Sequence, residues 1–254
     1  MEDLLIGIGL LVSLILAIEL GRWLGRLRSG REGADHEGHG PLDAAVFALV
    51  GLLVAFCFGG ASGRFEARRE MIINHTNSIG TAWLRLDLLP AEDRPPMRQL
   101  FRDYVDLLLW ARNVSDRQGH EAMVKRHDVL AAAIWSQAMR SVQRDPRPQV
   151  ATLVMPALNQ MLDDTTTRLA MTRMHQPPLV MPLMAGSLLV AALLAGVNMW
   201  QESRSRWVHV LAFALVASFA VLVTHDLEYP RSGFIQLDAE DQVMIDLRRS
   251  FGEP

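Results

Sequence analysis

The chain has 254 residues, of which 50% are hydrophobic and 21% charged, and its net charge is −3. Its 25 basic and 28 acidic residues nearly balance, which argues against a basic surface for nucleic acid, so nucleic acid is not an expected partner. The hydrophobic residues gather in four stretches, 4–20, 42–62, 179–200 and 207–224. A helix needs roughly 20 apolar residues to cross a bilayer. The sequence therefore predicts an all-α, multi-pass protein of the cell membrane, with four transmembrane helices in contact with lipid.

The first stretch is predicted to be a retained anchor. Glu2 and Asp3 stand where a secretory signal carries basic residues, and no small-residue cleavage site precedes Arg22. The one cysteine, Cys57, falls in the middle of the second stretch and has no partner for an intrachain disulfide.

The polar part of the chain lies between the second and third stretches. We expect four regions: 1–63 with two spans and a loop rich in Gly and His, 64–178 as an inserted helical extramembrane domain, 179–224 with two further spans, and 225–254 as a turn and a short helix. The even number of spans places both termini on the side of the inserted domain.

The second span is predicted to continue into the polar domain as one helix over 42–89. Apolar or small residues recur in steps of three and four beyond the span, which indicates one buried face; they are Ile72, Thr76, Ile79, Trp83 and Leu86. Gly59, Gly60 and Gly63 are possible bends, and Pro90 ends the helix.

Further helices are predicted from the same periodicity over 97–113, 123–142 and 150–174, the last kinked or started late by Pro156. A final helix is expected after Asp238, which with Asp241 resembles a capping box. The sequence shows no sustained alternation of period two, so strands are absent or minor.

Enzymatic chemistry is not indicated. The segment 35–39 contains His36 and His39, but this Gly-rich loop is interpreted as solvated because a zinc site needs three or four fixed ligands. No nucleophile elbow, phosphate-binding loop or dinucleotide fingerprint occurs. We therefore expect no catalytic residue, no metal site and no cofactor.

Two polar clusters leave alternatives open. The run 74–78 includes Asn74, Asn77 and Ser78, and it is either a packed helix face with satisfied hydrogen bonds or the wet vestibule of a pore. His225, Asp226 and Glu228, at the end of the fourth span, are either ordinary interfacial residues or a gate or proton relay.

Arg85 is predicted to form a structural ion pair with Asp103 or Asp106 on the following helix. In the alternative, Arg85 stays exposed at a pore mouth and concentrates anions there.

Three segments have distinctive sequences: Arg64-Phe65-Glu66-Ala67-Arg68-Arg69, the run 77–85 that reads N-S-I-G-T-A-W-L-R, and the closing run 226–235 with its D-L-x-x-P-x-S-G-x-I pattern. Together they resemble segments of bestrophin-like membrane proteins of unknown function. One departure is visible, because His75-Thr76 stands where Glu-Ala is expected. Segments 98–107 and 227–238 are more distantly similar to bestrophin anion channels. The second of these lacks the acidic clasp of calcium-regulated members, so calcium gating is not implied.

The resemblance implies a homo-oligomer, as in the pentameric bestrophins, that conducts small anions past its second span. Leu49, Leu53, Phe56 and Gly60 would line the neck and Asn74, Asn77 and Ser78 the vestibule. Ordinary helix packing at these positions, in a non-conducting membrane-anchored interaction or scaffold protein, is the alternative. Membrane orientation stays open, since the arginines of the short loops favour a cytoplasmic location for those loops whereas the resemblance places the helical domain in the cytoplasm.

Overall fold

The computed structural model describes residues 2–29, 40–112, 114, 116–171, 174–199, 207–230 and 233–252. It contains eight α-helices and one short 3-10 helix, η1, and these described residues form no strand. The chain divides into two compact units, 1–66 with 175–236 and 67–174 with 237–254. The loop with His36 and His39 lies outside the described residues.

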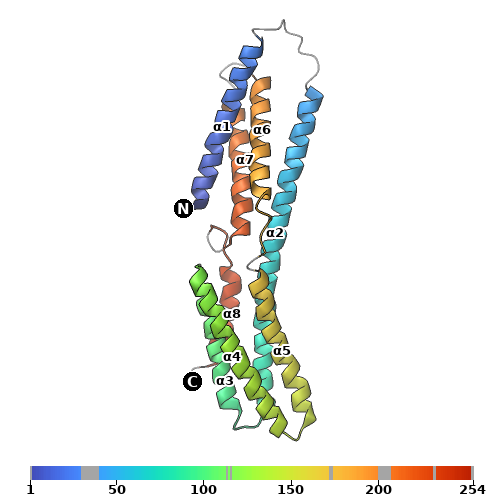
Figure 1. Ribbon diagram of the computed structural model, residues 1–254, viewed down its shortest axis with the longest axis vertical. Coiled ribbons are helices and arrows are strands. Elements are labelled where there is room, and N and C mark those ends of the chain that lie inside the picture. Colours follow the sequence, from blue (N-terminus) through green and yellow to red (C-terminus); the bar gives the residue numbers. More distant parts are fainter. Residues whose placement is uncertain are drawn as a thin grey trace. The chain divides into compact units, whose positions relative to one another are not determined.

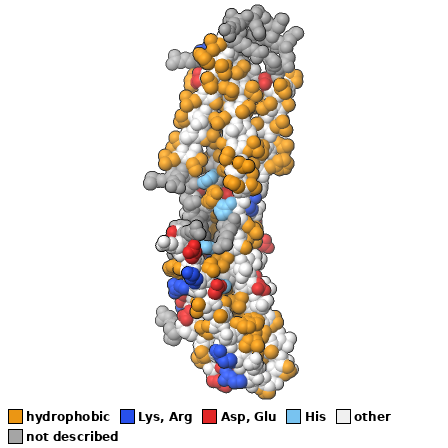
Figure 2. Space-filling view, in the orientation of Figure 1, with side chains coloured by type: hydrophobic (Ala, Val, Ile, Leu, Met, Phe, Trp, Pro, Cys, Tyr) orange, Lys and Arg blue, Asp and Glu red, His pale blue; other side chains and the backbone are white. Residues whose placement is uncertain are grey.

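Unit 1 holds four helices that are long and apolar enough to span a membrane. They are α1 (Glu2–Ser29), the first part of α2 (Gly40–Arg85), α6 (Val180–Asn198) and α7 (Trp207–Glu228). Figure 1 shows α1, α6 and α7 side by side, and Figure 2 shows apolar side chains over most of the visible face of this unit. The chain is therefore an all-helical membrane protein with four spans, as predicted.

A pair of glycines sets the closest approach in unit 1. A Cβ atom added to Gly196 of α6 would lie 2.1 Å from the Ile18 carbonyl oxygen of α1, and one added to Gly21 would lie 2.1 Å from the Leu193 carbonyl oxygen. Both positions therefore need glycine, because the clashing atoms belong to the backbone of the neighbouring helix. This close contact is typical of helix pairs in membranes, where small residues let the backbones approach.

Helix α2 is one uninterrupted helix that belongs to both units in turn. Its end follows from the sequence: η1 (Leu86–Leu88) tightens the last turn, Leu89 is extended, and Pro90 follows. The prediction of a single helix through this region is confirmed. The stripe predicted beyond the span is also confirmed, since Ile72, Thr76, Ile79 and Leu86 are buried and Trp83 is half-buried.

Unit 2 packs the second part of α2 with α3 (Arg94–Ala111), α4 (Arg117–Arg144), α5 (Pro148–Met171) and α8 (Asp238–Ser250). The late start considered for the helix over 150–174 is excluded, because α5 begins at Pro148 and Pro156 lies inside it. Helix α8 exists, but its N-cap is Leu237 and no side chain caps it, so the predicted capping box is wrong. Asp238 lies inside the first turn, where its charge still suits the helix dipole.

The core of unit 2 gathers apolar side chains from all five of its helices. Phe101 and Tyr104 of α3 are completely buried at its centre. Near the chain's end, Phe251 stacks on Trp83 with ring centroids 3.9 Å apart and an interplanar angle of 11°. This stack fixes the C-terminal segment to α2.

Candidate functional site

One face of α2 in unit 1 is not covered by the described residues of the chain. Leu49 and Phe56 are 66% and 70% exposed, and Leu52 and Gly59 are exposed beside them. Leu53 instead packs against the core of unit 1. The four residues predicted for a neck therefore do not share one environment.

Gly60 is the other half-covered member of the predicted set, and a Cβ atom there would lie 3.3 Å from Nη1 of Arg64. At about 100° per residue, positions 49, 52, 56, 59 and 63 form one stripe, whereas 53 and 60 lie on its covered flank. Both flanks are apolar, so the sequence did not reveal which one the other spans cover.

Three glycines on the exposed side of α2 pack against none of the described residues. An added Cβ at Gly51, Gly59 or Gly63 would meet no described atom within 4 Å. Glycine inside a helix is destabilising by roughly 0.5–1 kcal/mol relative to alanine. Since the fold of one chain does not require these glycines, they suit a surface that another helix approaches closely.

The polar run 74–78 divides between two environments in unit 2. Asn74 and Asn77 are exposed, whereas His75 and Thr76 are buried and Ser78 is half-buried. The Ser78 hydroxyl donates to the His75 carbonyl over 2.9 Å. The packed-face alternative therefore holds for His75, Thr76 and Ser78, whereas Asn74 and Asn77 are open to solvent and their place in a pore vestibule stays a prediction.

His75 belongs to a buried polar cluster with Tyr104 and Thr165. Its Nε2 lies 3.0 Å from the Thr165 hydroxyl and 3.4 Å from the Tyr104 hydroxyl, and the two hydroxyls are hydrogen-bonded to each other. Burial raises the pKa of the Tyr104 phenol above its usual value, so the phenol stays neutral. This cluster connects α2, α3 and α5, and gives His75 a packing role in place of the expected carboxylate.

Glu228, at the end of α7, is 2% exposed and binds two segments of unit 1. The Arg64 Nε atom donates to both carboxylate oxygens over 3.2 and 3.0 Å, and the backbone N–H of Gln176 donates over 2.7 Å. Arg64 and Glu228 both lie in segments that stand out in the sequence, but nothing in the sequence pairs them. The pair holds the end of the span in α2 against the end of α7.

Asp226 organises the loop that follows α7. Its carboxylate is 3% exposed and accepts hydrogen bonds from the Phe234 amide at 2.8 Å and the Ile235 amide at 2.7 Å. A Cβ atom at Gly233 would lie 1.5 Å from its Oδ1 atom. Within the D…G-x-I pattern, the acid thus caps two amides and the glycine makes room for its carboxylate.

The predicted pair between Arg85 and the acids of α3 is wrong. Arg85 donates to the Leu153 carbonyl of α5 over 2.6 Å. Asp106 instead accepts two hydrogen bonds, of 2.7 and 2.9 Å, from Arg248 of α8, and these bonds raise the pKa of the guanidinium. Asp103 accepts from Gln99 on its own helix. The physical reason is that a backbone carbonyl competes with carboxylates for an arginine, and carbonyls leave no trace in the sequence.

No group of three or more His, Cys, Asp or Glu side chains within the described parts of the chain could hold a metal ion. In comparison with known protein families, the model of the bestrophin-like domain matches residues 9–241. No curated protein and no solved structure matches the chain. Since the match covers nearly the whole sequence, including the Arg64, Asp226 and Gly233 segments whose contacts are given above, the chain belongs to the bestrophin-like family.

Proposed function

We propose that the protein is a homo-oligomeric channel for small anions in the cell membrane, with the exposed face of α2 turned towards the symmetry axis. The observation that carries the proposal is the stripe of Leu49, Leu52, Phe56, Gly59 and Gly63, which the other described helices leave open. In agreement with this, α2 has the smallest buried share of the four candidate spans, 17%. A ring of such stripes forms an apolar constriction that gates by dewetting. One copy cannot enclose a pore, so the function requires assembly, with five copies as the number that the family suggests.

The character of the same face changes outside the span. Glu70, Asn74 and Asn77 are exposed on the part of α2 in unit 2. Amide dipoles there suit a partly dehydrated ion, whereas the Glu70 carboxylate repels an anion. Glu70 is therefore expected to limit anion flux, and no chemical turnover is part of the proposal.

Purified protein in planar bilayers tests the proposal. Phe56→Ala removes the largest exposed side chain of the stripe and is expected to raise the anion current. Phe219→Ala is the matched control, because Phe219 is 65% exposed on α7, away from the stripe, and should leave the current unchanged. A wild-type protein without anion current, together with a silent Phe56→Ala variant, refutes the channel and favours a membrane-anchored interaction protein.

Selectivity has its own test. Glu70→Gln should raise anion conductance at low salt, where charges are least screened, and Glu92→Gln, at an exposed site outside α2, is the control. An unchanged conductance in Glu70→Gln would exclude this face of α2 from the ion path. Mass measurement in detergent checks assembly separately, since a monomer cannot conduct by this route.

A further inference from the structure

A groove of about 610 Å³ lies between α3 and α4 in unit 2. Leu107, Trp110 and Leu130 supply its apolar surface, and Asp103, Asp106, Lys125 and Arg126 are its charged lining residues. Its volume falls within the range of small-molecule sites, roughly 300–1,000 Å³. The groove is independent of the proposed ion path, which uses α2.

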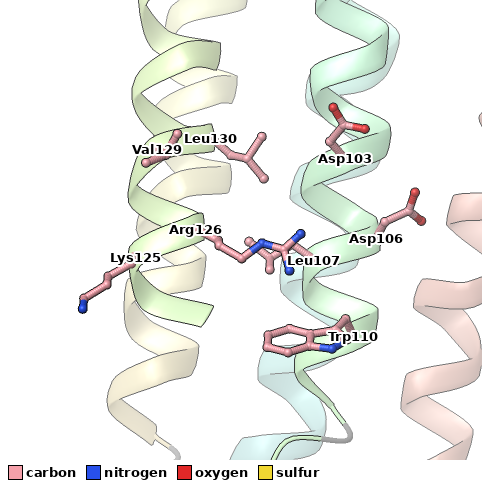
Figure 3. Close-up of a pocket in the computed structure, with 8 residues that line it drawn as sticks. All are labelled: Asp103, Asp106, Leu107, Trp110, Lys125, Arg126, Val129 and Leu130. Atoms are coloured by element: carbon pink, nitrogen blue, oxygen red, sulfur yellow. The ribbon is translucent and has the colours of Figure 1, made fainter. Parts of the chain in front are cut away.

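Arg126 differs from the other arginines of the protein. Among the arginines whose side chains the structure describes, it alone has neither an acidic partner nor a hydrogen-bond acceptor. Its guanidinium lies instead over the Trp110 ring, 5.5 Å from the centroid. Figure 3 shows this guanidinium reaching from α4 towards α3, between Leu130 and Trp110.

The acids of the groove do not neutralise Arg126. Both oxygens of Asp106 are occupied by Arg248, and in Figure 3 the Asp106 carboxylate points away from Arg126. Asp103 keeps its negative charge, because its partner Gln99 is neutral, but it forms no ion pair with Arg126. Lys125 adds a second positive charge at the rim, although its ammonium group points away from α3.

We propose that this groove binds an organic carboxylate with an apolar body. A guanidinium that stacks on an indole keeps its N–H edge free for a planar, bidentate carboxylate. The apolar body of the ligand would lie against Trp110, Leu107 and Leu130, where burial of its surface adds to the affinity. A ligand with only the carboxylate, or only the apolar body, would make half of these contacts.

Calorimetric titration of the full-length protein in detergent tests the proposal with phenylacetate as the probe. Phenylacetate should bind saturably, while 2-phenylethanol, which lacks the charge, and acetate, which lacks the body, should bind at least about tenfold more weakly. The factor follows from a hydrogen bond to a charged group, about 1.5–3 kcal/mol, where 1.4 kcal/mol is tenfold.

Three variants sharpen the test. Arg126→Gln should weaken phenylacetate binding about tenfold or more, and Arg140→Gln, on the exposed side of the same helix, should leave it unchanged. Asp103→Asn should tighten phenylacetate binding, because it removes a negative charge that repels the carboxylate of the ligand. A purely structural role for Asp103 would not produce tighter binding. Equal binding of phenylacetate and 2-phenylethanol, equal binding by Arg126→Gln, or no binding to the assembled protein would each overturn the proposal.

Discussion

Gly196→Ala tests the contact between α1 and α6. The added Cβ would lie 2.1 Å from the Ile18 carbonyl oxygen and 2.9 Å from its carbonyl carbon. Ordinary carbon–oxygen contacts begin at about 3.3 Å, so the two helices must separate by about 1 Å. A gap of this size forfeits a quarter to a half of each dispersion contact across the crossing. The buried side chains Leu14, Ile18, Leu188 and Ala192 are those affected.

We expect Gly196→Ala to lower the free energy of unfolding by about 2 kcal/mol, within the range for overpacking in a core. Gly186→Ala on the same helix is the control, because its Cβ would meet no described atom within 4 Å; it should be neutral or stabilise by about 0.5–1 kcal/mol. Unfolding of both variants in mixed detergent micelles measures the difference. Equal stability of the two would refute the reasoning, since the substitution is the same and only the neighbouring backbone differs.

Three further substitutions probe the contacts of the two units. Glu228→Gln removes the charge that binds Arg64 and should lower the free energy of unfolding by about 2 kcal/mol, less than for a fully buried pair because Arg64 is partly exposed. The control is Arg249→Gln, in the exposed pair with Asp246, which should change stability by less than about 0.5 kcal/mol. Similar losses for both variants would contradict a stabilising role for the pair of Glu228 and Arg64. Gly233→Ala should displace the Asp226 carboxylate from the amides of Phe234 and Ile235 and lower the free energy of unfolding by about 2–3 kcal/mol. Thermal unfolding measures this loss, and an unchanged melting temperature would contradict the expectation. Arg85→Gln should cost only about 1 kcal/mol, because the lost hydrogen bond to the Leu153 carbonyl, although it has a charged donor, is exposed to solvent. Dissociation or complete unfolding of this variant would show that Arg85 has a larger structural role.

The helices could be predicted from the sequence because their signals are local. Pro90, the Pro95-Pro96 pair and Pro148 mark helix ends within a few residues of where the structure has them. The buried stripe of α2 beyond the span follows a period that any helix imposes. These features do not depend on which helix packs against which.

The partners of charged residues could not be predicted in the same way. Arg64 and Glu228 are 164 residues apart, and many acids of the chain are equally plausible by type. Arg85 binds a carbonyl, a group that every residue carries. The exposed side of α2 was predicted only in part, since Leu53 was expected there and Leu52 was not. The two are the same residue type, and only the position of α1, α6 and α7 distinguishes them.

Lys125 is the one lysine of the chain, against 24 arginines, and it stands exposed at the rim of the groove between α3 and α4. Amine-reactive reagents therefore have a single side-chain target in the whole sequence. A fluorophore attached there would report on the neighbourhood of Trp110 without any engineered site. Ligand binding in the groove can thus be followed by spectroscopy with a label on a native residue.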